Sequence, residues 1–286
     1  MTEAATAAKE RRVRVPGAEL HVLDAGEGDP VVLVHGWPQH GHMWRHLVPE
    51  LAATRRVLVP DLRGFGRSEA PPGDYRKHTL AGDLVALLDA EGIERATLIG
   101  HDWGGWAAWL VALEHPGRVE RLVAIDIPPP WGGGVTVRRL PQQLTIGLYQ
   151  AIISAPFLGV RSVQSGAMPG GILRGGSAKA MRYSEAELET YLAPLREEPR
   201  ARASVALYRT FLTREAPAIA RGTYTTDDLR VPTLAIYGSE SKLVKMTGLP
   251  EPGPELRVEV VAGSGHFVPE EKPDEVARLV QGFLAG

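Results

Sequence analysis

GHDWGG at residues 100–105 is the stretch that decides the fold. It follows the apolar run ATLIG at 96–100 and precedes a segment at 104–115 with helical spacing. Glycines on both sides of Asp102 leave room for a sharp backbone turn, where larger side chains would clash. The stretch therefore predicts a strand-to-helix turn that holds one reactive side chain, the carboxylate of Asp102, at its apex.

Similar apolar runs recur along the chain without the alternation of half-exposed strands, a pattern typical of strands that are covered on both faces. They lie at residues 31–35, 56–60, 96–100, 122–126, 233–237 and 258–261. An alternating hairpin precedes them at 13–24. Helical patterns separate most of them, at 79–91, 104–115 and 273–284. This order predicts an α/β fold with a mostly parallel eight-stranded sheet flanked by helices.

One long segment, residues 128–230, contains no buried-strand pattern. Ser184 and Glu187 form a capping-box pattern at the start of a helical stretch at 184–199. Residues 201–212 also have helical spacing. The segment therefore predicts a helical cap that is inserted after the sixth strand.

Two glycine-rich stretches within this cap, 131–134 and 169–177, predict mobile loops. The chain on either side of the cap supplies all the predicted strands. We therefore expect two domains, an α/β core formed by 1–127 and 231–286 and a helical cap formed by 128–230.

The composition favours a small-molecule ligand. The 32 basic and 34 acidic residues give a net charge of −2 with no long run of one sign, unlike proteins that bind nucleic acid or anionic membranes. The absence of cysteine excludes disulfides and thiolate chemistry, and the polar start MTEAATAAKERR lacks the apolar core of a secretory signal. We expect a cytoplasmic protein with no nucleic-acid or membrane partner, and the sequence leaves its oligomeric state open.

Two further loops follow predicted strands and extend the candidate catalytic site. HGWP at 35–38 follows the first buried strand, and the backbone amides of Trp37 and Trp103 could converge on one developing oxyanion. GSGHFVPEEKP at 263–273 places His266 on a glycine-flanked loop after the last strand. A histidine in such a loop can act as a general base near neutral pH, and the nucleophile precedes it in the chain as expected.

These motifs resemble the α/β-hydrolase superfamily over almost the whole chain, with HGWP, DLRGFGRS at 61–68, GHDWGG and GHFVPEEKP as the matching set. Aspartate at the apex, where serine is more usual, is similar to the branch of epoxide hydrolases, haloalkane dehalogenases and fluoroacetate dehalogenases. An ionised carboxylate attacks sp3 carbon without a base to deprotonate it. The resemblance implies an aspartyl ester at Asp102, which water activated at His266 then hydrolyses.

Two cap tyrosines favour an epoxide as the substrate. Opening an epoxide creates a basic alkoxide that needs a proton, and tyrosine, with an ordinary pKa of about 10, stays protonated at neutral pH. LYQAIISAP at 148–156 resembles the first tyrosine motif of soluble epoxide hydrolases and identifies Tyr149. ALYRTF at 206–211 resembles the second and identifies Tyr208. Haloalkane dehalogenases lack this pair, although Trp103 could bind halide.

The acid that should orient the histidine is missing from its usual place. In most epoxide hydrolases it lies three residues after a glycine that ends the next-to-last strand, and here that position is Ser241, which cannot supply the charge. Glu240 is one residue away, where a loop side chain points elsewhere. Asp126 ends the strand after the nucleophile helix, where several dehalogenases hold their acid, and we favour it. An aspartate there could instead hydrogen-bond the turn into the cap.

These observations predict a cofactor-independent epoxide hydrolase without a metal, which converts a small-molecule epoxide and water into a vicinal diol. The expected catalytic residues are Asp102, His266, Asp126, Tyr149 and Tyr208. Trp37 and Trp103 are expected to bind substrate together with the two tyrosines and to supply the oxyanion hole. Two alternatives stay open, a haloalkane or haloacid dehalogenase with the same nucleophile and a non-catalytic ligand-binding member of the fold.

Overall fold

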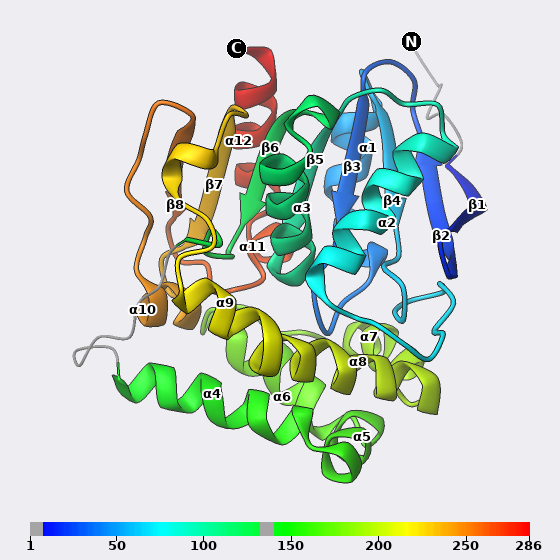
Figure 1. Ribbon diagram of the computed structural model, residues 1–286, viewed down its shortest axis with the longest axis vertical. Coiled ribbons are helices and arrows are strands. Elements are labelled where there is room, and N and C mark those ends of the chain that lie inside the picture. The colour runs from blue at the N-terminus through cyan, green and yellow to red at the C-terminus, as the bar shows by residue number, and fades with distance from the viewer. Residues whose placement is uncertain (1–7, 132–139) are drawn as a thin grey trace.

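Eight strands form one sheet in the computed structural model of the protein, which describes residues 8–131 and 140–286. The strands are β1 Lys9–Val15, β2 Ala18–Ala25, β3 Pro30–Val34, β4 Arg56–Pro60, β5 Ala96–His101, β6 Val119–Ile125, β7 Thr233–Gly238 and β8 Leu256–Val261. Their order in the sheet is β1-β2-β4-β3-β5-β6-β7-β8 (Figure 1). β2 pairs antiparallel with β1 and β4. The other six strands, β4, β3, β5, β6, β7 and β8, run parallel to one another.

Helices cover both faces of the sheet. The core helices are α1 Leu47–Ala52, α2 Lys77–Ala90, α3 Asp102–Glu114, α10 Lys242–Thr247, α11 Val268–Glu271 and α12 Pro273–Ala285, with short 3-10 turns at Gly41–Trp44 and Pro116–Arg118. Successive side chains of a strand point to opposite faces. On β3, Val32 and Val34 therefore pack into a core with α2 and α3, whereas Val31 and Leu33 pack into a second core with α1 and α12. Burial on both faces explains the continuous apolar runs.

Between β6 and β7 the chain forms a helical cap, as expected from the sequence. Its helices are α4 Leu140–Ser154, α5 Pro156–Gln164, α6 Ala167–Gly176, α7 Glu185–Leu195, α8 Glu198–Thr210 and α9 Ala216–Ala220, with a π-helical segment Phe211–Glu215 and a 3-10 turn Thr226–Asp228. Figure 1 shows the cap helices across the end of the sheet at which α3 begins. The cap therefore covers the turn that joins β5 to α3.

The glycine-rich stretch 169–177 corrects one expectation, because most of it belongs to helix α6 rather than to a mobile loop. Its glycines have no positive φ, and Leu173 within it is fully buried. The Ser177 hydroxyl donates to the Leu173 carbonyl oxygen and closes the last turn. Packing thus offsets the helix cost of glycine, about 1 kcal/mol per residue relative to alanine. The other glycine-rich stretch, 131–134, lies almost entirely outside the described residues.

The helical pattern at 184–199 divides into two helices. The capping box forms at Ser184, and α7 ends at Leu195 before α8 begins at Glu198. Pro199 lies in the first turn of α8, where a missing N–H leaves no helical hydrogen bond unmade. No helix in the described part of the chain is both long and apolar enough to cross a membrane.

Candidate active site

The strand-to-helix turn places Asp102 directly after β5, as the first residue of α3. Asp102 has a φ of 49°, a left-handed conformation that is strained for a residue with a side chain. Its surroundings require glycine: a Cβ on Gly36 would lie 2.4 Å from the Asp102 Cβ, and a Cβ on Gly104 would lie 2.2 Å from the His35 carbonyl oxygen. This packing holds the carboxylate at the N-terminus of α3, where the helix dipole favours a negative charge.

The two carboxylate oxygens of Asp102 have different surroundings. The Trp37 backbone N–H donates to Oδ2 at 3.0 Å, and the Trp103 backbone N–H also hydrogen-bonds the carboxylate. Oδ1 lies 3.8 Å from His266 Nε2, which is too far for a hydrogen bond. The Trp37 amide therefore holds Oδ2, whereas Oδ1 faces the histidine.

The charge of Asp102 depends on opposing effects. Its side chain is buried, and burial raises the pKa of the carboxyl group. The charge of protonated His266 and the amides of Trp103 and Trp37 act in the other direction by stabilising the carboxylate. These donors therefore favour the ionised form, which is the form in which a carboxylate can act as a nucleophile.

A short hydrogen bond joins the histidine to an aspartate. His266 Nδ1 lies 2.6 Å from Oδ2 of Asp126, which follows β6, is fully buried and has a φ of 46°. The Gly238 N–H donates to Oδ1 at 3.1 Å, and the Ser241 hydroxyl donates to Oδ2 at 2.7 Å. Glu240 is exposed, and its carboxylate accepts the Lys179 backbone N–H at 3.5 Å. The structure thus brings Asp126 to His266, and the serine at the usual acid position supports this aspartate.

The hydrogen bond also defines the state of the imidazole. Burial favours neutral His266, but the hydrogen bond and charge of Asp126, together with the charge of Asp102, raise its pKa above the ordinary value. With a carboxylate accepting at Nδ1, neutral His266 carries its hydrogen there and presents the Nε2 lone pair toward Asp102. The adjacent His101 is fully buried, and burial lowers its pKa well below the usual range. Of these two rings, His266 is therefore the one that can be charged near neutral pH.

Tyr149 of α4 and Tyr208 of α8 lie against each other, with ring centroids 6.1 Å apart. Tyr208 also meets the rings of Trp37 and Trp103 edge-on, at 5.1 and 5.6 Å. Burial raises the pKa of both tyrosines, and the negative charge of Asp102 raises each further. Both are therefore protonated at neutral pH and lie close enough to Asp102 to respond to its charge.

Three residues that the sequence analysis did not single out support this site. The Ser204 hydroxyl accepts a hydrogen bond from the Trp37 indole N–H at 2.9 Å. The Glu271 carboxylate accepts from the backbone N–H groups on both sides of His266, at 2.8 and 2.9 Å. Lys77 lies over the indole ring of Trp103, the residue after Asp102. Only Glu271 had a local signal, because it belongs to the same short motif as the histidine.

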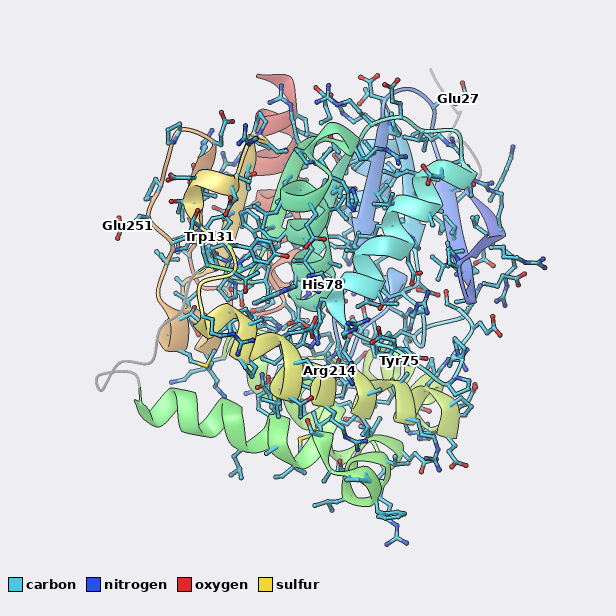
Figure 2. All side chains as sticks on the ribbon, in the orientation of Figure 1. Glu27, Tyr75, His78, Trp131, Arg214 and Glu251 are labelled. Atoms are coloured by element: carbon cyan, nitrogen blue, oxygen red, sulfur yellow. The ribbon has the colours of Figure 1, made fainter. Side chains whose placement is uncertain are left out.

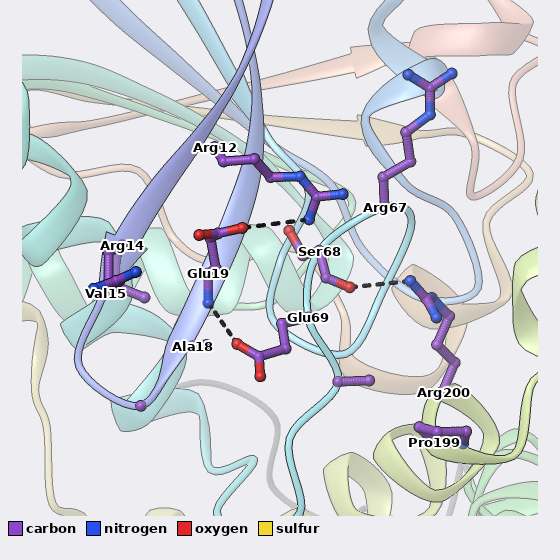
Figure 3. A pocket seen from close by; sticks show the side chains of 12 residues that line it. Arg12, Arg14, Val15, Ala18, Glu19, Arg67, Ser68, Glu69, Pro199 and Arg200 are labelled. Atoms are coloured by element: carbon purple, nitrogen blue, oxygen red, sulfur yellow. Dashed lines mark hydrogen bonds and ion pairs between the residues drawn. The ribbon is translucent and has the colours of Figure 1, made fainter.

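A separate hollow of about 700 Å³ lies between the β1–β2 hairpin, the loop at 67–70 and the start of α8 (Figure 3). Its charged groups are largely paired with one another and with the backbone. Arg12 lies 4.0 Å from Glu19, and Arg200 Nη2 donates to the Ser68 carbonyl oxygen at 3.1 Å. None of the expected catalytic residues lines this hollow, so it is distinct from the candidate active site.

Comparison with known proteins agrees with the fold and the motifs. Residues 29–273 match the family described as alpha/beta hydrolase fold. The chain is 30% identical over 292 residues to the soluble epoxide hydrolase of Corynebacterium sp. (strain C12), covering 95% of both chains. It is 33% identical over 327 residues to epoxide hydrolase A of Mycobacterium tuberculosis, covering 97% of both.

A solved structure of a related protein has the same architecture. The epoxide hydrolase CorEH without ligand superposes with a TM-score of 0.85 at 28% sequence identity, covering 97% of this chain and 99% of that one. The family match spans most of the chain, and the epoxide hydrolases match it over nearly their full length. The chain therefore belongs to the α/β-hydrolase fold family, as a hydrolase of its epoxide hydrolase branch.

Proposed function

We propose that this protein is an epoxide hydrolase that converts an epoxide into a vicinal diol through an ester at Asp102. The observation that carries the proposal is that two protonated tyrosines, Tyr149 and Tyr208, lie together near a carboxylate held by backbone amides. An active site that opens an epoxide needs both a nucleophile and a proton donor. The names of the relatives support the same substrate class.

In the first step a lone pair of Asp102 Oδ1 attacks an epoxide carbon, and the bond from that carbon to the ring oxygen breaks. Tyr149 or Tyr208 gives its proton to the departing oxygen, which becomes a hydroxyl group, and a tyrosinate remains. General acid catalysis of this kind contributes ~10²–10⁴-fold to a rate. The product of the step is a neutral ester between the substrate and the Asp102 side chain.

In the second step His266 removes a proton from water, and the hydroxide adds to the ester carbon. Negative charge then develops on Oδ2 of Asp102, which already accepts the Trp37 amide, and one such donor is worth about 3 kcal/mol. The Trp103 amide also hydrogen-bonds this carboxylate. The bond from the ester carbon to Oδ1 then breaks, so Oδ1 leaves as a hydroxyl oxygen of the diol after taking the proton of the new carboxylic acid, and the oxygen from water remains on Asp102. The proton on His266 returns to the tyrosinate through solvent, which restores the starting state.

Asp126 has a separate part in this scheme. It does not touch the substrate, but its carboxylate accepts from His266 Nδ1 and so keeps the Nε2 lone pair free for water. It also stabilises the imidazolium that forms when His266 takes the proton. Without a charge at this place the histidine would be a weaker base in a buried site.

One observation favours a second candidate, a dehalogenase that uses the same nucleophile. The indole N–H of Trp103 is buried, and its one side-chain partner among the described residues is Tyr208. Such a donor can stabilise a departing halide, which needs no proton. A dehalogenase would therefore use Asp102 and His266 but would not depend on the two tyrosines.

A single turnover in oxygen-18 water separates these functions. The protein would be mixed in excess with an aryl epoxide or a bromoalkane, and the peptide that contains Asp102 would be analysed by mass spectrometry. Entry of label into the Asp102 carboxyl group, with release of an unlabelled diol, is the expected result. Label that appears only with the bromoalkane would identify a dehalogenase, and no label with either would contradict the ester mechanism. Asp102→Asn is the matched control, in which the initial carboxylate is absent and neither ester nor label forms.

A further inference from the structure

A fully buried lysine, Lys77, lies at the boundary between the core and the cap and has no part in the steps above. It is the first residue of α2, and its side chain is 0% exposed. Figure 2 shows Tyr75, two residues before the lysine, and His78, one residue after it, near the helical segment of the cap that includes Arg214. Removing an ammonium group from water costs several kcal/mol unless it is well paired. Its partners therefore indicate what the buried charge does.

The ammonium group contacts both domains. It donates to the Leu207 carbonyl oxygen at 2.7 Å, pairs with the Glu215 carboxylate at 2.9 Å and lies 4.3 Å from the centroid of the Trp103 ring. Leu207 precedes Tyr208 in the chain, and Trp103 follows Asp102. One charged group thus contacts the neighbour of the nucleophile and the neighbour of a candidate acid.

The acidic partner, Glu215, ends the π-helical segment Phe211–Glu215 that follows α8. Such segments are rare and occur frequently at functional sites. Glu215 Oε1 also accepts the Lys77 backbone N–H at 2.7 Å, so the side chain and the backbone of the lysine bind the same carboxylate. The Glu215 side chain is 7% exposed, which removes both charges of the pair from water. These contacts fix the C-terminal end of α8 to the start of α2.

We propose that Lys77 is a positioning residue for epoxide ring opening, which rests on the proposed function. By binding Leu207, Glu215 and the Trp103 ring at once, it sets the distance between the Tyr208 hydroxyl and the Asp102 carboxylate. Ring opening needs these two groups on one substrate, and a misplacement of about 1 Å can cost ~10²-fold in rate. Ester hydrolysis depends instead on His266 and backbone amides. Loss of Lys77 should therefore slow the first step selectively.

The charge of the lysine changes within an accessible pH range. Burial lowers the pKa of Lys77 to about 8, against the opposing effect of the Glu215 carboxylate. The other charged groups that act on this pair are Asp102, Asp74, His78 and Glu114. As the pH rises through about 8, Lys77 loses its charge, and both the ion pair and the cation–π contact weaken. The rate of ester formation should fall in the same range.

The test measures the two steps separately in Lys77→Met, with the exposed cap lysine variant Lys179→Met as a matched control. Rapid mixing with an aryl epoxide and mass spectrometry of the intact protein give the rates of ester formation and ester loss. We expect Lys77→Met to slow ester formation roughly 10- to 100-fold and to lose its alkaline decline, with ester loss unchanged. Equal slowing of both steps, or wild-type ester formation, would overturn the proposal.

A second variant tests whether slow ester formation in Lys77→Met comes from misfolding. A second measurement tests the lysine contact without using the reaction. Lys77→Met/Glu215→Gln removes both buried charges, so it should fold stably and still form ester slowly. The Trp103 indole NMR signal, assigned with Trp103→Phe, should shift between about pH 7 and 9 in the wild type and stay constant in Lys77→Met. A constant signal in the wild type would refute the lysine contact even for a protein that forms no ester. Wild-type protein that shows the shift without forming ester would refute the proposed function and, with it, the positioning of that step.

Discussion

Replacement of Asp126 by asparagine tests how the histidine is oriented, because the surrounding donors determine how the new amide must lie. Oδ1 of Asp126 accepts the Gly238 N–H at 3.1 Å, so the asparagine oxygen takes this place. The NH2 group then replaces Oδ2, which accepts from His266 at 2.6 Å and from Ser241 at 2.7 Å. An NH2 group cannot accept a hydrogen bond, so His266 must present an unprotonated Nδ1 and carry its hydrogen on Nε2.

This tautomer cannot take a proton from water at Nε2. The same carboxylate-to-amide change in the triad of a serine protease lowers kcat ~10⁴-fold, which is ~5.4 kcal/mol at ~1.36 kcal/mol for each factor of ten. We therefore expect Asp126→Asn to slow ester hydrolysis ~10³–10⁴-fold. Ester formation does not use His266 as a base and should stay near the wild-type rate. The covalent ester should accumulate.

Intact-protein mass spectrometry after rapid mixing with an epoxide would detect the ester and follow its decay. Ser241→Ala is the matched control, because it removes one donor to Asp126 but keeps the carboxylate and therefore the tautomer. Its effect on ester hydrolysis should be much smaller. Near-normal turnover of Asp126→Asn without accumulated ester would refute the reasoning. A large loss in Glu240→Gln would instead transfer the role to that exposed carboxylate.

Three further outcomes follow from the same geometry. Tyr208→Phe and Tyr149→Phe should each slow ester formation from an epoxide by ~10²-fold or more, measured in single turnover, with ester hydrolysis unchanged and with the cap variant Tyr183→Phe as the control. Glu271→Gln leaves one oxygen for the amides on both sides of His266, so it should lower the free energy of unfolding by about 1–3 kcal/mol in urea titration and slow ester hydrolysis more than ester formation. The rate of ester hydrolysis should fall as the pH drops through the pKa of His266 in the ester, because only neutral imidazole accepts the proton. In a pH–rate profile this midpoint should lie below the pKa of His266 in the free protein, because the ester no longer carries the Asp102 charge that helps to raise it. A midpoint at or above the pKa that an NMR titration gives for His266 in the free protein would contradict the effect assigned to Asp102.

The elements that the sequence predicted best are those whose pattern is set by burial alone. The run at 96–100 lies in a strand between two parallel neighbours. Its residues are apolar without alternation because both faces of that strand are buried. The prediction of a mobile loop at 169–177 was wrong. The glycines indicate only a low intrinsic helix propensity, whereas burial of Leu173 in the folded cap stabilises the helix. Propensity is a weak guide where packing between domains is strong.

The site shows the same limit at the level of single residues. Asp102 and His266 lie in short motifs whose local geometry requires glycines, so the sequence alone could identify them. The partner of His266 could not be settled in this way, because Asp126 and Ser241 are 115 positions apart and meet only when β6 and β7 pair. Lys77 had no signal at all, since a lysine in a helical stretch is normally exposed.

The charges of Asp102 and His266 depend on each other, and this coupling separates the two proposed steps. In the free protein the carboxylate raises the pKa of His266, and the imidazolium opposes the rise that burial causes in the pKa of Asp102. Ester formation converts the carboxylate into a neutral group, so its contribution to the pKa of His266 disappears. The imidazolium then loses its proton more readily and becomes the base that hydrolysis requires. Asp126 still accepts the hydrogen bond from Nδ1, so the orientation of the ring is retained while its proton affinity falls. Consumption of the nucleophile thus prepares the base for the step that regenerates it.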